Sequence, residues 1–183
     1  GIGVEALDEG RALIAQIALH LEVGVERERR IVAVLELAAE AVHQVVGGER
    51  EAAVGGLAEA QAVYGHLPPQ DLATAMLDDG AQSVALRMGE KGSLLASHTS
   101  GECWHIPAVP VEHIHDQTGA GNTYCGAVLW GLLDGKSLSE AGAAGAVAAS
   151  FSIEKVGVVN PGEIDTGKRN ERYAGCLATM RNY

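Results

Sequence analysis

Asp116-Gln117-Thr118-Gly119-Ala120-Gly121-Asn122 (residues 116–122) runs directly into the apolar segment 123–133. The small residues at 119–121 let the backbone turn tightly and approach a ligand, and the segment that follows has the length of a helix. The first amides of a helix lack internal partners, and the helix dipole adds about half a positive charge at that end. This segment therefore predicts an anion hole for a phosphate or a developing oxyanion. The alternative is a tight glycine turn capped by Asn122, because Gly-Ala-Gly alone is a weak motif.

Residues 116–129 resemble the second signature of the PfkB carbohydrate kinases, a ribokinase-like family, which reads Asp-Thr-x-Gly-Ala-Gly-Asp before a helix of small residues. Residues 84–92 resemble the family's strand and Gly-x-x-Gly turn beside the nucleotide. Residues 145–157 resemble the small-residue helix that follows the anion hole. The resemblance covers about residues 80–162. It implies an α/β fold, the ribokinase-like three-layer α/β/α sandwich, with an N-terminal part that is short or missing.

The activity implied by the resemblance is ATP-dependent transfer of a phosphoryl group to a hydroxyl of a sugar, a nucleoside or a related small molecule. The amides at Gly119, Ala120 and Gly121 would stabilise the transferring group. The family has an Asp, its general base, where this chain has Asn122. An amide can orient a hydroxyl but cannot accept its proton at neutral pH. A competing interpretation is therefore a pseudokinase that serves as a nucleotide-binding or structural subunit.

The resemblance also implies where ATP binds. It places Gly89, Lys91 and Gly92 in the turn beside the nucleotide and Thr118 next to the anion hole. It places the adenine between the small-residue helix and a segment that begins at Gly157. The family often has a hydroxyl residue at position 87, where this chain has an Arg. A hairpin needs glycine in such a turn in any case, which is the alternative explanation for residues 89–92.

Two metal sites follow from the resemblance, one for Mg²⁺ and one for a monovalent cation such as K⁺. Asp116 and Thr118 match positions that help form the monovalent-cation site, and their alternative role is to form the turn. The family's Mg²⁺-linked Glu follows an Asn by three residues. Glu40 stands at the Glu position with Leu37 at the Asn position, so the match is partial, and a surface glutamate is the favoured alternative. His113 and His115 could form a metal pair on a strand, but a third ligand is missing nearby.

Hydrophobic periodicity predicts the elements around these motifs. Helices are expected at 5–22 and 37–46, with a buried strand at 31–35 between them. A short helix at 71–77 that ends near Gly80, followed by a strand at 83–88, is one half of a βαβ unit and predicts a parallel sheet covered by helices.

Downstream, a hairpin is expected to join the strand at 83–88 to one at 93–97. Residues 104–111 read as an edge or irregular strand because of their prolines. Ser137 and Glu140 have the spacing of a capping box that starts a second helix. The tail from Asp165 reads as polar and irregular, with Arg169 and Arg172 on the surface.

Composition narrows the class of protein. A chain of 183 residues with 47% apolar residues is most economically one domain spanning 1–183. Its formal charge of −11 opposes binding to nucleic acids. Three widely spaced cysteines are typical of reduced thiols, so an intracellular, cytoplasmic location is expected, with an organelle as the alternative. The apolar runs are too short to span a membrane. The resemblance implies a small-molecule acceptor as the partner, and a homodimer or larger assembly stays open.

The first 80 residues carry no comparable match to the family. The family's early glycine motif, sugar-binding face and lid precede the region that resembles this chain. Three alternatives follow: a fragment, a truncated paralogue, or part of a longer polypeptide.

Overall fold

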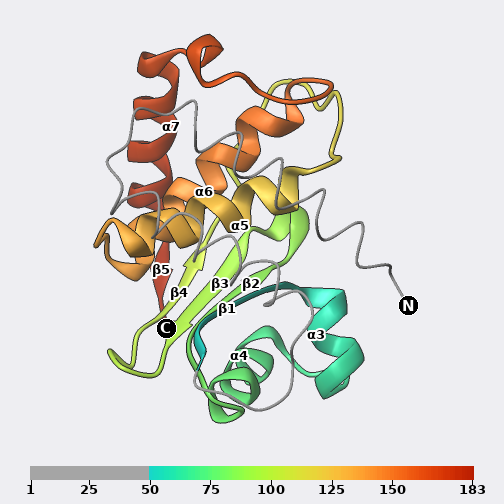
Figure 1. Ribbon diagram of the computed structural model, residues 1–183, viewed down its shortest axis with the longest axis vertical. Helices are drawn as coiled ribbons and strands as arrows, with labels where there is room; N and C mark the ends of the chain where they lie inside the picture. The colour runs from blue at the N-terminus through green and yellow to red at the C-terminus, as the bar shows by residue number, and fades with distance from the viewer. Residues whose placement is uncertain (1–49) are drawn as a thin grey trace, which may run out of the picture.

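The computed structural model describes residues 50–183, which form a five-stranded sheet of order β1-β2-β3-β4-β5 covered by helices (Figure 1). The strands are β1 (Arg50–Gly56), β2 (Ala81–Arg87), β3 (Ser93–Ser97), β4 (Cys103–Ile106) and β5 (Arg181–Asn182). The α-helices are α3 (Leu57–Tyr64), α4 (Pro69–Asp78), α5 (Ala120–Leu133), α6 (Leu138–Ile153) and α7 (Thr166–Thr179). The elements expected at 5–22, 31–35 and 37–46, and with them Glu40, lie outside the described residues.

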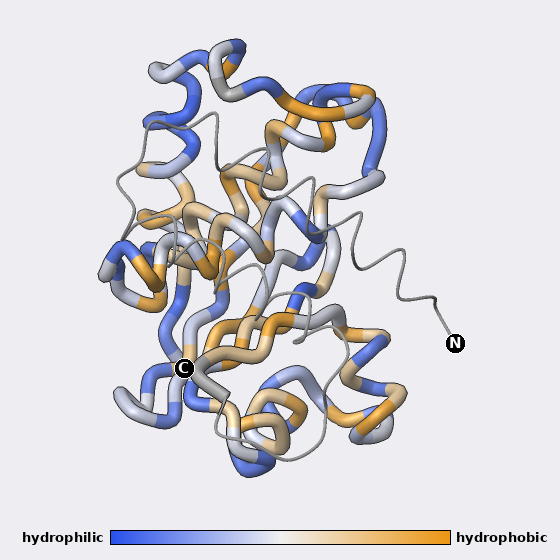
Figure 2. The backbone as a smooth tube through the Cα atoms, viewed as in Figure 1, coloured by the Kyte–Doolittle hydropathy of each residue, from blue (hydrophilic) through white to orange (hydrophobic). Residues whose placement is uncertain are grey.

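The sheet is the middle layer of three. Figure 1 shows α5, α6 and α7 on one face and α3 and α4 on the other, which confirms the expected α/β/α sandwich. Each face has its own apolar cluster, and the hydrophobic colour in Figure 2 follows the strands between the helices. Successive strand residues point to opposite faces, so Leu94 packs in the cluster under α4 and Leu95 in the cluster under α6. Both leucines are fully buried, which makes β3 a central strand.

Only one strand pair among the described residues is parallel. β1 runs parallel to β2, with Ala53 opposite Val84, and α3 and α4 cross between them as the predicted βαβ order requires. The other three pairs are antiparallel, so the expectation of a parallel sheet holds for β1 and β2 alone. β1 itself was not predicted, because its sequence is rich in Ala and Gly and carries little β-propensity.

The hairpin between β2 and β3 is confirmed. The amide of Met88 donates to the carbonyl of Gly92 at 2.8 Å, and a single 3₁₀ turn (Gly89–Lys91) fills the connection. Gly92 has φ +85°, and a Cβ built there would stand 2.1 Å from the carbonyl oxygen of Ile106. Glycine is therefore required at this position by both the backbone conformation and the space.

Two expectations for the C-terminal part need correction. β4 is not an edge strand, because β5 returns from α7 and pairs with it, but residues 107–111 form no regular strand, in agreement with the irregular alternative. The tail is not irregular: α7 begins after Asp165, whose carboxylate accepts from the amide of Lys168 at 2.7 Å as an N-cap. The sequence analysis missed α7 because the segment is polar in composition, with Cys176 as its only buried residue.

The small residues of α6 allow a close approach to α5, as expected. A Cβ built on Gly145 would stand 2.6 Å from Cγ2 of Val128, so the contact between the two helices has no room for a larger side chain at position 145. The capping box that starts α6 is also confirmed. Ser137 Oγ accepts from the amide of Glu140, and the Glu140 carboxylate accepts from the amide of Ser137 at 2.9 Å.

Candidate phosphate-binding site

The first turn of α5 exposes backbone amides. Gly119 is its N-cap in the left-handed conformation (φ 80°, ψ −9°), and the first helical hydrogen bond runs from the amide of Thr123 to the carbonyl of Gly119 at 2.9 Å. The amides of Gly121 and Asn122 precede that bond, so α5 itself offers them no acceptor. The amide of Ala120 differs, because it donates to the carbonyl of Gln117 at 3.2 Å. Asn122 is exposed on this turn.

Hydrogen bonds hold the loop before α5, both within its own turn and to the end of α6. The amide of Thr118 donates to Oδ1 of Asp116 at 2.9 Å, and hydrogen bonding from Thr118 lowers the pKa of Asp116. The Asp116 carboxylate is therefore ionised at neutral pH. The amides of His115 and Asp116 both donate to the carbonyl of Ile153 at the end of α6, at 2.8 and 3.3 Å. The predicted cation-site residues Asp116 and Thr118 thus form a turn anchored to α6.

Arg87 brings a side-chain cation to the same turn. It is the last residue of β2, and a Cβ built on Gly121 would stand 1.9 Å from its Nη1 atom. The guanidinium therefore lies across the glycine in the first turn of α5. Its side chain is 23% exposed, and the buried Nε has no hydrogen-bond partner among the described residues.

Glu59 is a carboxylate at this site that the sequence reasoning missed. It lies in the first turn of α3, with Oε2 at 3.5 Å from Nη2 of Arg87, and the same oxygen accepts from the amide of Gly56. Gly56 in turn pairs with Arg87 across β1 and β2. One signal could have found it: Gly56-Leu57-Ala58-Glu59 has the Asn-x-x-Glu spacing at a strand-to-helix junction, with glycine at the Asn position. Ligands of α/β proteins often bind where the carboxyl ends of parallel strands meet helix N-termini, which is the location of this group.

A buried hydrogen bond ties α5 to the hairpin. Tyr124 Oη donates to Oγ of Ser93 at 2.7 Å, and burial of the phenol raises its pKa. Ser93 follows Gly92 directly, so this bond fixes the first turns of α5 relative to the glycine turn. The structure thereby connects two of the segments that the sequence analysis singled out. A second hydrogen bond holds the glycine turn to β4: the carbonyl oxygen of Lys91 lies 2.8 Å from Nε2 of His105.

The loop around Gly157 follows α6 and is exposed. Gly157 has φ +83°, and its neighbours Val156 and Val158 are 70% and 91% exposed. An ion pair between Lys155 and Glu163 joins the two ends of this loop. The predicted adenine-binding segment therefore presents apolar surface to solvent.

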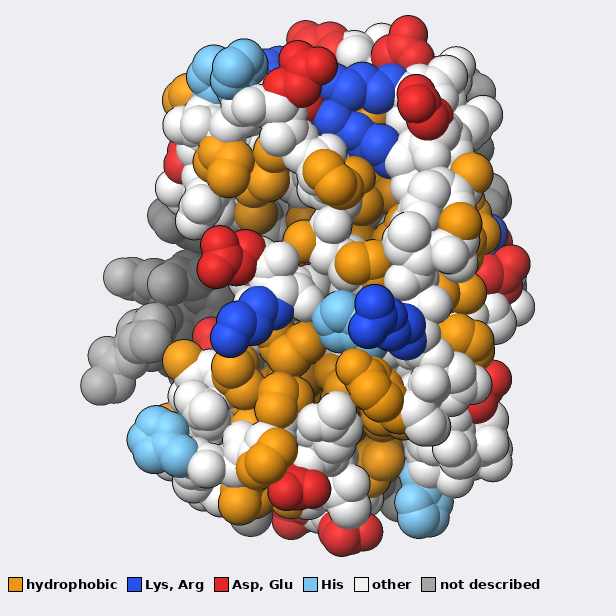
Figure 3. Space-filling view, turned by 180° about the vertical axis from the view of Figure 1, so that it is seen from behind, with side chains coloured by type: hydrophobic (Ala, Val, Ile, Leu, Met, Phe, Trp, Pro, Cys, Tyr) orange, Lys and Arg blue, Asp and Glu red, His pale blue; other side chains and the backbone are white. Residues whose placement is uncertain are grey.

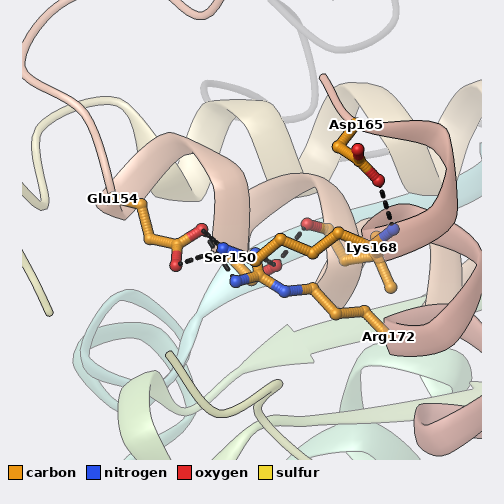
Figure 4. A network of polar contacts seen from close by, with 6 residues as sticks. Ser150, Glu154, Asp165, Lys168 and Arg172 are labelled. Atoms are coloured by element: carbon orange, nitrogen blue, oxygen red, sulfur yellow. Dashed lines mark hydrogen bonds and ion pairs between the residues drawn. The ribbon is translucent and has the colours of Figure 1, made fainter. Parts of the chain in front are cut away.

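A polar network beneath this loop joins α6 to α7 (Figure 4). Arg172 Nη2 lies 2.8 Å from Glu154 Oε2, Nη1 donates to Ser150 Oγ at 2.9 Å, and the guanidinium carbon lies 4.5 Å from the centroid of the Phe151 ring. Lys168 adds a second cation at 3.1 Å from Glu154 Oε1. Hydrogen bonding from Arg172 and Lys168 lowers the pKa of Glu154 against the effect of its partial burial. The Arg172 side chain is only 9% exposed, so its expected surface position is wrong, whereas Arg169 is exposed.

No group of three or more metal-ligating side chains occurs within residues 50–183. His113 and His115 are both exposed, and their rings lie edge to face with centroids 6.4 Å apart. On the face drawn in Figure 3, the described Lys and Arg side chains gather in separate groups with acidic side chains near them. None of the described helices has the length and apolarity that a membrane span needs.

Comparison with known structures defines the class of fold. Ribokinase from Thermotoga maritima is 26% identical with a TM-score of 0.56, over 68% of this chain and 42% of that chain. Adenosine kinase from Sinorhizobium meliloti is 26% identical with a TM-score of 0.57, over 66% of this chain and 36% of that chain. The chain therefore has the ribokinase-like fold.

Sequence comparison defines the family. The model of the family described as "pfkB family carbohydrate kinase" matches residues 17–165, and the chain belongs to this family. The expectation that the first 80 residues carry no comparable match is therefore wrong, because the match begins at residue 17. A curated relative, 2-dehydro-3-deoxygluconokinase of Bacillus subtilis, is 29% identical over 126 residues, which are 69% of this chain and 37% of the relative. The chain thus spans less than half the length of the relatives it matches.

Proposed function

We propose that this chain carries the nucleotide-binding and phosphoryl-transfer part of a PfkB-type kinase, which transfers the γ-phosphoryl group of ATP to a hydroxyl of a small molecule. The observation that carries the proposal is the exposed first turn of α5. There, the left-handed Gly119 opens the helix, the amides of Gly121 and Asn122 lack helical acceptors, and the guanidinium of Arg87 lies alongside. Such a turn binds phosphate through its amides and the helix dipole.

In this proposal the amides of the turn stabilise the charge that spreads over the transferring phosphoryl oxygens. Gly121 and Asn122 offer theirs directly, and Gly119 supplies the backbone conformation that directs them. The amide of Ala120 joins them once a phosphate oxygen replaces the Gln117 carbonyl as its acceptor. The exchange costs little, because one hydrogen bond replaces another.

The nucleotide would extend from this turn over two neighbouring segments. Gly89, Lys91 and Gly92 would border its phosphates, with Thr118 beside them, since the bond between Tyr124 and Ser93 holds the hairpin against α5. The adenine would lie on the apolar surface of the loop at Gly157. The exposed valines of that loop provide an apolar surface on which a flat aromatic ring can be buried.

Mg²⁺ would bridge the ATP phosphates and neutralise charge there. Magnesium sites commonly use one or two carboxylates with waters and substrate phosphates, and Glu59, 69% exposed beside the anion hole, fits that requirement. Glu59 therefore replaces Glu40 in the proposal as the metal-linked carboxylate. Asp116, ionised at neutral pH, would help hold a monovalent cation such as K⁺ beside the turn.

The acceptor would be a sugar, a nucleoside or a related compound. Three substrates follow from the names of the relatives: ribose, adenosine and 2-dehydro-3-deoxygluconate. Asn122 would hydrogen-bond the acceptor hydroxyl and orient it. Without a carboxylate base, the proton of the acceptor hydroxyl would pass to water as its oxygen bonds to the γ-phosphorus and ADP leaves, so turnover is expected to be lower by about 10² to 10⁴ than with an Asp.

The test is Asn122→Asp in the full chain, with ADP formation measured against the three acceptors. We expect turnover to rise by about 10²-fold or more with an acceptor that the chain binds. Asn122→Ala is the matched control, because it removes the orienting amide without supplying a base and should lower turnover further. Nucleotide binding by Asn122→Asp without any gain in ADP formation would contradict the transfer activity.

A second candidate is a pseudokinase that binds nucleotide without transferring phosphate. Asn122 in place of the family's Asp favours it. The variant Asn122→Asp distinguishes the two candidates. It should raise the turnover of a kinase, but it should not restore turnover to a pseudokinase that has lost its acceptor site. Both predict that the wild-type chain binds ATP.

A further inference from the structure

We propose that Arg87 is the side-chain cation of the anion hole and that Glu59 is its exchangeable counter-ion, which a phosphate group displaces. The inference rests on the proposed function and adds to it a residue that contacts the transferring group. It follows from two contacts of the Arg87 guanidinium group and from one of its donors that lacks a partner among the described residues.

The first contact is between Arg87 and Gly121. Nη1 stands where a side chain at position 121 would begin, 1.9 Å from the ideal Cβ, and the Cζ atom is 3.2 Å from that point. A guanidinium in this place lies beside the unpaired amides of the first turn. Guanidinium groups bind phosphate oxygens in pairs because their N–H donors form a fork.

The second contact is the ion pair with Glu59, and it is loose. The 3.5 Å between Nη2 and Glu59 Oε2 exceeds the roughly 2.7–2.9 Å of a good charge-assisted hydrogen bond. The Glu59 side chain is 69% exposed, so water can solvate its carboxylate when the ion pair with Arg87 breaks. Exposed pairs of this kind contribute little to stability, and a doubly or triply charged phosphate is a stronger partner for the arginine.

The third feature is the buried Nε of Arg87, which lacks a partner among the described residues. A buried donor without an acceptor is costly and indicates a group held for a ligand or for a different side-chain position. A small rotation toward the first turn of α5 would let the guanidinium use more of its donors on phosphate oxygens. The resting pair would thus keep the hole electrically neutral until an anion arrives.

Binding of inorganic tripolyphosphate to the full chain, by titration calorimetry in EDTA, tests this without nucleotide base or metal. Arg87→Met should weaken binding by about 10-fold or more, because a charge-assisted contact is lost. Glu59→Gln should tighten binding about two- to fivefold, because a competing, repelling carboxylate is removed. Arg169→Met is the matched control: it removes the same charge from the exposed face of α7 and should leave binding within twofold of wild type.

The outcomes separate the inference from the proposed function. If the wild-type chain binds tripolyphosphate and Arg87→Met binds it equally well, or if Arg169→Met loses as much, the role of Arg87 is refuted while the phosphate site stands. Should Arg87→Met fail to fold, the surface variant Glu59→Gln still decides, since unchanged or weaker binding refutes the exchange. If the wild-type chain binds neither tripolyphosphate nor ATP with Mg²⁺, the phosphate site is refuted, and the inference with it.

Discussion

Arg87 occupies the space that a side chain at position 121 would take. This relationship joins the carboxyl end of β2 to the amino end of α5, and it explains why the first turn of α5 has glycine at its second helical residue. The atom that meets the built Cβ is the far end of a flexible side chain, so a larger residue at 121 would displace the arginine and leave the fold intact.

Gly121→Ala should therefore weaken ATP binding by about 10-fold, because the guanidinium leaves the first turn of α5. The free energy of unfolding should change by less than about 1 kcal/mol, since the helix keeps its conformation. Calorimetry on Gly121→Ala, Arg87→Met and the double variant measures the coupling. Fully additive losses would show that the alanine acts through something other than Arg87.

Gly145→Ala should destabilise the chain by about 1–3 kcal/mol through overpacking between α6 and α5. Its Cβ would stand 2.6 Å from Val128 and 2.9 Å from the Tyr124 ring, and neither neighbour has free space. Gly175→Ala in α7 is the control, because nothing lies within 4 Å of its built Cβ. That variant should gain up to about 1 kcal/mol. Urea unfolding of both variants checks the difference, and equal stability of the two would refute the close approach at Gly145.

Tyr124→Phe should lower the free energy of unfolding by about 1–2 kcal/mol, because it leaves the buried hydroxyl of Ser93 without its donor. Adding Ser93→Ala removes the stranded hydroxyl, so the double variant should lose less than the sum of the single ones. A double-mutant cycle by urea unfolding gives the coupling energy. A coupling near zero would mean that the bond does not hold the hairpin to α5.

Glu154→Gln should destabilise the chain by about 2 kcal/mol at pH 7, because it leaves Arg172, 9% exposed, without its ion partner. The pKa of Glu154 lies below its ordinary value of 4.5 in the folded chain. Its contribution to stability is therefore present above about pH 4.5 and is lost as the pH falls through the lowered folded pKa.

The difference in the free energy of unfolding between wild type and Glu154→Gln should accordingly become smaller below pH 4. Thermal unfolding across pH 3–7 measures it. Glu163→Gln is the control, since its pair with Lys155 is exposed and should contribute less than about 1 kcal/mol. A gap that stays constant down to pH 3 would argue against an ionised Glu154 as the partner of Arg172.

Features set by neighbouring residues could be predicted from the sequence. The hairpin depends on Gly92, whose backbone conformation few other residues adopt, and the capping box depends on a spacing of three between Ser137 and Glu140. The tight turn before α5 was recognisable for the same reason, because Gly119 permits the left-handed start of that helix.

Features set by tertiary contacts could not be predicted in this way. Glu59 and Arg87 lie 28 residues apart, and their pairing depends on the parallel register of β1 and β2. Arg172 looks like a surface residue within a polar segment, yet the aromatic face of Phe151 and the carboxylate of Glu154 bury it. The helix α7 was missed because its sequence is polar. An N-cap at Asp165 and a few apolar contacts hold it in place.

Thermal unfolding of the full chain with and without ATP and Mg²⁺ tests the central claim most directly, which is that the first turn of α5 binds the phosphates of ATP. With ATP at 100 times its dissociation constant, the free energy of unfolding should rise by about 2.7 kcal/mol, and adenine at the same concentration should stabilise the chain less. An unfolding transition that ATP leaves unchanged at millimolar concentration would contradict the account.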